Sequence, residues 1–343
     1  MCVAFGAAYI WLSVSINAGN TAHTVLLLFP GRHMATASSR PAEWVINSLQ
    51  VGRLWLLIQR KETRHLRLYL NFLRSQNRLS NRPVISPGGP VLSLTSYGRR
   101  IQSVYLAIES IAAASYLPSR LILWLDDSKT FYNLPETIKR LQARGLEVKL
   151  TENLGPHTKY YPTLGIMGDL DEPLVICDDD QLYTRKWLEK LMKAFRENPE
   201  IVSCYRAHVV RLLEDRIAPY TKWRSCASDK PSMLHFATGV SGIVLPPRLL
   251  RALRERGTEF KALCPAADDI WLHVNAIRAG MRTRQIGSWQ RNFPIIPGTQ
   301  TQRLMDANVS GSQNDVQIAR TYNAQDIALL QREATWSAAV QVV

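Results

Sequence analysis

The chain has 343 residues, 46% of them apolar and 20% charged, and 42 Lys and Arg against 28 Asp and Glu give a formal net charge of +14. This length and apolar content are enough for one large domain with appendages or for two medium ones, which excludes intrinsic disorder. Ordinary glycine and proline contents and the lack of internal repeats exclude collagen and solenoids. The net charge predicts a polyanionic partner, which is a nucleic acid, an anionic membrane surface or a phosphate-bearing substrate.

The five cysteines are scattered along the chain, without a CxxC pair or a Cys/His cluster at zinc spacing. This pattern argues against a disulfide framework and a structural zinc site. We therefore expect a reducing compartment, and the cytoplasm is the default.

The first segment, residues 1–33, is apolar, and its first 30 residues carry no formal charge. It lacks the basic start of a signal peptide, and Asn17 to Asn20 interrupt the apolar run before the length of about 20 residues that a membrane-spanning helix needs. We favour neither assignment for this segment, and Met34 is an alternative start.

Residues 34–82 form a basic segment, because nine basic and two acidic side chains between Arg40 and Arg82 give it half of the net charge. Its arginines recur at helical spacing, whereas Leu66, Leu70 and Leu73 mark another face, so the pattern predicts a basic amphipathic helix. Two interpretations stay open: the helix packs on a globular domain, or it lies on anionic lipid at the inner face of the cell membrane.

Residues 83–90 are rich in proline and glycine, and we expect a linker there, followed by a domain over 91–325 and a tail over 326–343. In that domain, apolar strands alternate with helical patterns, which predicts a mainly parallel α/β sheet covered on both faces. The expected strands are Val91–Thr95, Leu121–Leu125, Leu146–Leu150 and Pro173–Cys177, and the expected helices include Ile101–Ser115 and Pro135–Arg144.

Three aspartates, Asp178, Asp179 and Asp180, follow the last of these strands. Ligands bind outside the carboxyl ends of parallel strands, and residues i and i+2 of an extended chain face the same side. Asp178 and Asp180 are therefore candidate ligands for Mg²⁺ or Mn²⁺, with water and substrate phosphates completing the coordination. The alternative interpretation is an exposed acidic turn.

An apolar strand that ends in a DxD motif within a βαβ domain resembles the nucleotide-sugar glycosyltransferases of the GT-A fold. Further segments are similar to bacterial family-2-like glycosyltransferases of polysaccharide assembly, and the resemblance covers roughly residues 90 to 325. These segments are Val91 to Ile101, His157 to Leu164, Pro219 to Trp223, Thr238 to Pro247 and Ala267 to Leu272.

The resemblance implies a nucleotide-diphosphate sugar as donor, a glycan or lipid-linked acceptor, and a Mn²⁺ or Mg²⁺ ion on Asp178 and Asp180. It also implies a general base at Asp269, or failing it Asp268, and an inverting displacement at the anomeric carbon. Donor-binding roles are implied for Thr95, Ser96, Tyr97, Asp126, Asp127, Lys159 and Asp179, and acceptor-side positions for Gly239, Gly242 and Trp271.

The chain departs from the family pattern in its histidines, because none follows His273, where many such enzymes have a further metal ligand. We expect His273 and His208 to be packed in the interior rather than bound to metal, and the third ligand stays open, with Asn292 one possibility.

Other functions fit less well. A haloacid-dehalogenase-type phosphatase needs a hydroxyl or valine where Leu182 stands. A nucleic-acid-binding module lacks a recognition motif, so we expect no nucleic acid as partner. A nucleotidyltransferase would have a glycine-rich loop after the first strand, where Thr95 to Gly98 contain one glycine. An inactive membrane-associated scaffold is the non-enzymatic alternative.

Overall fold

A computed structural model of the chain describes residues 9–18, 21–30, 63–214, 216–300 and 313–340. Two compact units are distinguished, Met1–Thr63 and Arg64–Val343. In the first, β1 (Tyr9–Ala18) pairs antiparallel with β2 (Thr21–Pro30). None of the helices in these described ranges combines the length and the apolar character needed to cross a membrane. Most of the predicted basic segment, residues 34–62, lies outside the described residues.

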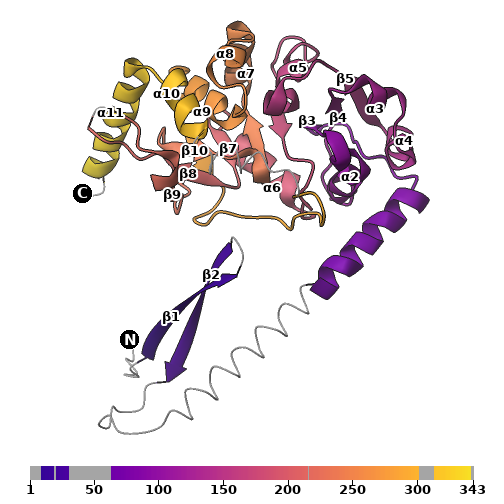
Figure 1. Ribbon diagram of the computed structural model, residues 1–343, viewed down its shortest axis with the longest axis horizontal. Coiled ribbons are helices and arrows are strands. Elements are labelled where there is room, and N and C mark those ends of the chain that lie inside the picture. The colour runs from indigo at the N-terminus through magenta and orange to yellow at the C-terminus, as the bar shows by residue number, and fades with distance from the viewer. Residues whose placement is uncertain (1–8, 19–20, 31–62, 215, 301–312, 341–343) are drawn as a thin grey trace. The chain divides into compact units, whose positions relative to one another are not determined.

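The second unit is built on a seven-stranded sheet with the order β12-β7-β11-β6-β3-β4-β5 (Figure 1). Strands β3, β4, β5 and β6 are mutually parallel where they pair, β12 is parallel to β7, and β11 alone runs antiparallel to its neighbours. The sheet confirms the predicted mainly parallel α/β fold and all four predicted strands. The strands are β3 (Val91–Thr95), β4 (Arg120–Leu125), β5 (Leu146–Leu150), β6 (Leu174–Ile176), β7 (Val202–Cys204), β11 (Ile243–Leu245) and β12 (Thr283–Gln285).

Helices cover both faces of this sheet, because alternate strand residues bury their side chains on opposite sides. In β3, Leu92 and Leu94 join one core and Val91 joins the other. The first core packs α2 (Val104–Ala112), α4 (Glu136–Gln142) and α6 (Trp187–Glu197), and the second packs α5 (Tyr161–Leu164), α7 (Pro247–Arg256), α8 (Phe260–Leu263) and α9 (Asp268–Arg278).

The remaining described elements complete this unit around the large sheet. A small antiparallel sheet has the order β10-β8-β9. Its strands are β8 (Ala207–Val209), β9 (Arg224–Ser225) and β10 (His235–Ala237), and the other helices are α3 (Ser128–Tyr132), α10 (Gln313–Thr321) and α11 (Ala324–Val340).

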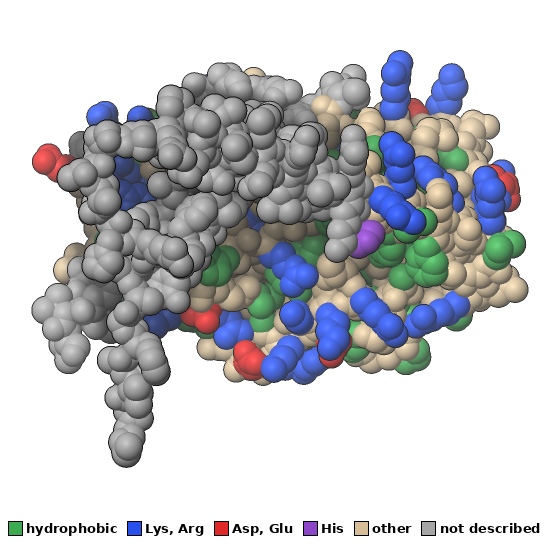
Figure 2. All heavy atoms as spheres, turned by 90° about the horizontal axis from the view of Figure 1, so that it is seen from below, with side chains coloured by type: hydrophobic (Ala, Val, Ile, Leu, Met, Phe, Trp, Pro, Cys, Tyr) green, Lys and Arg blue, Asp and Glu red, His purple; other side chains and the backbone are tan. Residues whose placement is uncertain are grey.

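A helix over 63–79 precedes the sheet and, from Arg64 on, belongs to the same compact unit. Its buried face, with Leu70 and Leu73, packs on Leu106, Leu182 and Ile296. This confirms a helix over the described part of the basic segment and shows that the predicted leucine face packs on the domain. Figure 2 views this side of the molecule, where Lys and Arg side chains stand among hydrophobic ones.

The predicted linker 83–90 contains no helix or strand, but its backbone is bonded to the domain. The Val84 amide donates to Arg144 O at 2.9 Å, the Ser86 amide donates to Pro118 O at 2.8 Å, and the Val84 side chain is fully buried. These contacts join the helix over 63–79 to the sheet by a fixed connection.

Candidate active site

The three aspartates lie where β6 ends, beside the end of its parallel neighbour β3. Asp179 turns towards β3, where it accepts hydrogen bonds from Ser96 Oγ at 2.6 Å and from Arg100 Nη1 at 2.8 Å. The same Arg100 nitrogen is 3.3 Å from Asp180 Oδ2. Burial raises the pKa of Asp179 to about 6, and Arg100 and Ser96 oppose this rise. The strand ends therefore bring together Ser96 and the three aspartates.

Asp178 points to a different partner, Lys159, at the end of the 3₁₀ helix η2 (Gly155–Lys159). Lys159 Nζ lies 2.8 Å from Asp178 Oδ1 and 3.2 Å from Asp268 Oδ2. Burial alone would lower the pKa of this amine, but Asp178, Asp268 and Asp269 together hold it well above its usual value. The buried Lys159 cation thus links the DxD motif to the acidic start of α9.

Asp268 and Asp269 occupy the first turn of α9, where the positive end of the helix dipole favours carboxylates. Asp269 Oδ1 accepts the Gly239 amide at 2.9 Å, whereas Asp268 pairs with Lys159. Burial, and next the charge of Asp268, raise the pKa of Asp269 to about 8. A carboxylate with a raised pKa accepts protons readily near neutral pH, which is what a general base requires.

The two glycines of the Thr238 to Pro247 segment have different functions in the structure. A methyl group at Gly239 would lie 3.2 Å from Lys159 Nζ and 3.3 Å from Asp269 Oδ1, so glycine at this position lets the backbone approach the acidic cluster. At Gly242, φ is +99° and a methyl group would lie 2.6 Å from Cζ2 of Trp187. Gly242 is therefore required by the packing of Trp187, and Gly239 by the site.

The charges of the cluster favour a bound cation. Four of its five carboxylates, those of the DxD motif and of Asp268, form ion pairs with two basic side chains, Arg100 and Lys159, and the fifth, that of Asp269, accepts the Gly239 amide. Carboxylate oxygens are ligands that suit Mg²⁺ or Mn²⁺. Burial, and next the charge of the nearby Asp178, raise the pKa of Asp180, so the carboxylates of Asp178 and Asp180 interact. Within the described ranges no three His, Cys, Asp or Glu side chains are grouped as metal ligands. An ion held by these two carboxylates would take its other ligands from water and substrate phosphates.

Other predicted donor-binding residues lie at the same edge with structural contacts of their own. Thr95 Oγ1 donates to Trp124 O on β4 at 3.1 Å. Asp127 caps α3 by accepting the Thr130 amide at 2.9 Å, and Asp126 is half-buried beside it. The Tyr97 ring lies under the Arg100 guanidinium, 5.3 Å from ring centre to Cζ. A donor contact at each of these residues stays a prediction.

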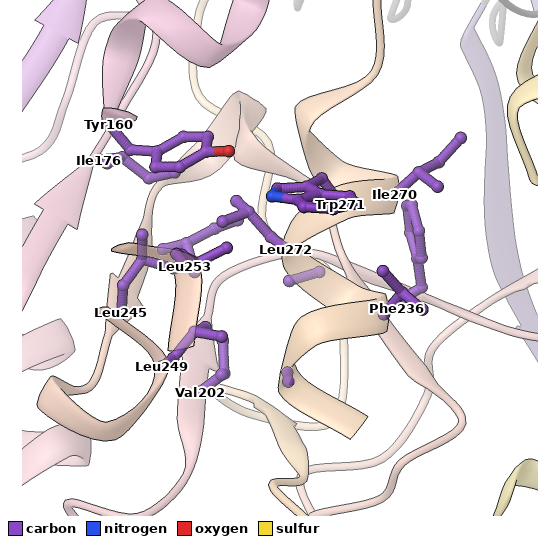
Figure 3. Close-up of a cluster of buried hydrophobic side chains, with 14 of the residues drawn as sticks. Tyr160, Ile176, Val202, Phe236, Leu245, Leu249, Leu253, Ile270, Trp271 and Leu272 are labelled. Atoms are coloured by element: carbon purple, nitrogen blue, oxygen red, sulfur yellow. The ribbon is translucent and has the colours of Figure 1, made fainter. Parts of the chain in front are cut away.

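Trp271, predicted on the acceptor side, lies in the core that α9 shares with Phe236 and Phe260 (Figure 3). Its side chain is fully buried. Because an acceptor could reach this side chain only if the core opened, we make no functional proposal for Trp271.

His273 is buried and His208 half-buried, as expected for packed rather than metal-binding histidines. His273 Nε2 donates to Met233 O at 2.9 Å, and Nδ1 lies 2.6 Å from the Tyr322 hydroxyl. Burial lowers the pKa of His273 to about 4, and that of the half-buried His208 to about 4 as well. Asn292 is exposed and stays an untested possibility as a ligand.

Sequence reasoning missed two residues of the site, Arg100 and Gln300. Arg100 follows β3 on the 3₁₀ helix η1 (Gly98–Gln102), and Gln300 Nε2 donates to Asp180 Oδ2 at 2.7 Å. The position of Arg100 shortly after a strand that ends beside the acids was a usable signal. No local pattern pointed to Gln300, which comes from a loop 120 residues further along the chain.

No protein-family model and no curated protein matches this chain. Similar solved structures include a CMP-2-keto-3-deoxy-manno-octonic acid synthetase complexed with CTP, at 14% identity and a TM-score of 0.36 over 66% of this chain and 100% of that one. Another is S. aureus TarS 1–349, at 11% identity and a TM-score of 0.38 over 58% of each chain. Likenesses this distant carry no argument about the reaction, which must come from the site itself.

Proposed function

We propose that the protein is a metal-dependent glycosyltransferase that moves a sugar from a nucleotide-diphosphate donor to an acceptor hydroxyl with inversion. The observation that carries the proposal is that the buried Lys159 forms ion pairs with both Asp178 and Asp268. The next residue, Asp269, accepts a hydrogen bond from the Gly239 amide. This arrangement supports the proposal because carboxylates that could hold a cation lie next to a carboxylate of raised pKa. A transferase of this class needs both, one for the leaving diphosphate and one for the acceptor proton.

Each side chain then has a definite task. A divalent ion held by Asp178 and Asp180 would neutralise the charge that develops on the leaving nucleoside diphosphate. Asp269 takes the proton of the attacking hydroxyl, and the Gly239 amide fixes the orientation of its carboxylate. Lys159 holds Asp178 and Asp268 in place, and Arg100 holds Asp179 and Asp180.

The test is release of nucleoside diphosphate from a panel of nucleotide sugars, with and without Mn²⁺. We expect Asp180→Asn to remove the metal-dependent release. For Asp269→Asn, we expect transfer to acceptor to fall on the order of 100-fold while the donor still raises Tm by binding. Asp171→Asn is the matched control, because Asp171 is an exposed acid whose partner is Arg251.

Four outcomes would contradict the proposal. Undiminished turnover in EDTA would show that the reaction needs no metal, and full transfer by Asp269→Asn would show that Asp269 is not the general base. Release of pyrophosphate from a nucleoside triphosphate and a sugar would instead identify a nucleotidyltransferase, and a flat response to every donor would favour an inactive scaffold.

A further inference from the structure

The helix over 63–79 has a second apolar face that its packing leaves uncovered. Leu68, Phe72 and Leu79 are 58%, 46% and 81% exposed. At about 100° per residue these three positions fall within about 40° of arc on the helix, on the side away from Leu70 and Leu73. We call Leu68, Phe72 and Leu79 the outer stripe. Its residues are aligned along one line of the helix, which scattered surface hydrophobics are not.

The helix is held so that this stripe faces away from the domain. Its inner face is buried through Leu70 and Leu73. Near its end, Asn77 Nδ2 donates to Glu109 Oε1 and to Thr137 O, each at 3.0 Å, and Arg140 Nε donates to Asn77 Oδ1 at 3.2 Å. Rotation that buried the outer stripe would break all of these contacts. The exposure is therefore built into the fold.

The flank of the outer stripe is strongly basic. Four arginines, Arg64, Arg67, Arg74 and Arg78, are exposed on this helix, and residues 63–82 contain no acidic side chain. On the helical wheel they lie on one side of the stripe, centred about 100° from it. In Figure 2, Lys and Arg side chains surround hydrophobic ones on this side of the described unit.

We propose that this helix docks on a membrane surface that carries anionic phospholipids. The outer stripe would enter the boundary between headgroups and acyl chains, and the arginines beside it would contact lipid phosphates. Only a partner that is both apolar and anionic uses the two features together. A nucleic acid would neutralise the arginines but leave Leu68, Phe72 and Leu79 in water.

Docking there would bring the candidate active site to the membrane. The inner face of the helix packs on Leu182 and Ile296. Leu182 lies two residues after Asp180, and the Ile296 amide donates to Asp180 O at 2.8 Å. The helix thus connects the lipid surface to the DxD motif within one packed unit. Resting on the proposed function, this arrangement favours a lipid-linked acceptor over a soluble glycan.

The test is flotation of the full chain with vesicles of phosphatidylcholine, alone or mixed with phosphatidylglycerol. We expect binding only to the mixed vesicles. Leu68→Ser, Phe72→Ser and Leu79→Ser combined should weaken binding at least tenfold, because their apolar surface no longer enters the bilayer. Arg64→Gln and Arg67→Gln should each weaken it about fivefold. The matched controls are Val316→Ser, an exposed hydrophobic on α10, and Arg248→Gln, an exposed arginine on α7; both should bind normally.

Wild-type binding by the triple serine variant would overturn the proposal, and so would equal binding to vesicles without phosphatidylglycerol. The proposal would also be overturned if the wild-type chain bound no vesicles but formed a dimer in light scattering, and the triple variant did not. The outer stripe would then be a contact with a second copy of the chain. Asp180→Asn should bind vesicles as the wild-type chain does. The vesicle assay therefore tests the docking surface independently of the proposed glycosyltransferase activity.

Discussion

Replacing Gly239 by alanine tests whether the close approach of backbone and acids matters for activity. The new methyl group would lie 3.2 Å from Lys159 Nζ and 3.3 Å from Asp269 Oδ1, so both groups must move by a few tenths of an ångström. A misplacement of about 1 Å costs on the order of 100-fold in rate, and a shift of about 0.3 Å therefore predicts a loss of about three- to tenfold. Gly239 does not have positive φ, so alanine carries no backbone penalty and its loss of stability should stay well below that of Gly242→Ala.

Gly242→Ala is the companion variant with the opposite expected result. Its φ of +99° and the methyl group 2.6 Å from the Trp187 ring predict a destabilisation of about 2–4 kcal/mol. For a unit of this size Tm should fall by about 3–7 °C. The assay pairs thermal unfolding with kcat/KM for nucleoside diphosphate release, measured at a temperature where both variants are folded.

The reasoning fails if Gly239→Ala retains full kcat/KM, because Lys159 and Asp269 would then tolerate displacement and would not be in the reacting geometry. It fails equally if Gly239→Ala loses as much stability as Gly242→Ala, since the position would then be required by the fold alone.

Three further predictions concern charged and titratable groups. Arg100→Lys keeps the charge but replaces the planar guanidinium, one nitrogen of which contacts both Asp179 and Asp180, by an ammonium on a shorter side chain. We therefore expect kcat/KM to fall about tenfold, whereas the exposed neighbour variant Arg99→Lys should be unaffected. Glu109→Ala leaves Arg144 buried without its carboxylate and should lower the free energy of unfolding in urea by about 3–5 kcal/mol; a loss below about 1 kcal/mol would contradict a buried pair. Burial lowers the pKa of His157 to about 3, so the unfolded state binds a proton below pH 6.5 that the folded state does not. Stability should therefore fall as pH falls from 6.5 towards 3, and His157→Gln should flatten this slope by about 1.4 kcal/mol per pH unit; an unchanged slope would refute it.

The sheet and its acidic edge could be predicted because their signals are local. A run such as Leu174 to Cys177 is long and apolar enough to indicate a buried strand, and parallel strands bring their ends to one edge whatever the loops do. Asp178 to Asp180 could therefore be placed at this edge from sequence.

The contacts that complete the site could not be predicted, because they depend on side chains brought from distant loops. Gln300 donates a hydrogen bond to Asp180 from a distant loop, and hydrophobic periodicity in the sequence does not predict where a loop lies. Trp271 shows a related limit: α9 is buried on nearly every side from Ile270 to Ile277, so its pattern does not distinguish a core residue from one that faces a ligand. In the helix over 63–79 the sequence indicated only the face with Leu66, Leu70 and Leu73, and the outer stripe was found from the exposure of its side chains in the structure.

The packing of that helix also decides where the chain can be shortened. Leu70 and Leu73 cover Leu106, Leu182 and Ile296, and the compact unit begins at Arg64. A truncation at residue 82, where proline and glycine suggest a domain boundary, would expose this core next to the DxD motif. If such a fragment is inactive, the cause would be a damaged fold, and a truncation that ends before residue 63 is the one that preserves the compact unit from Arg64 to Val343.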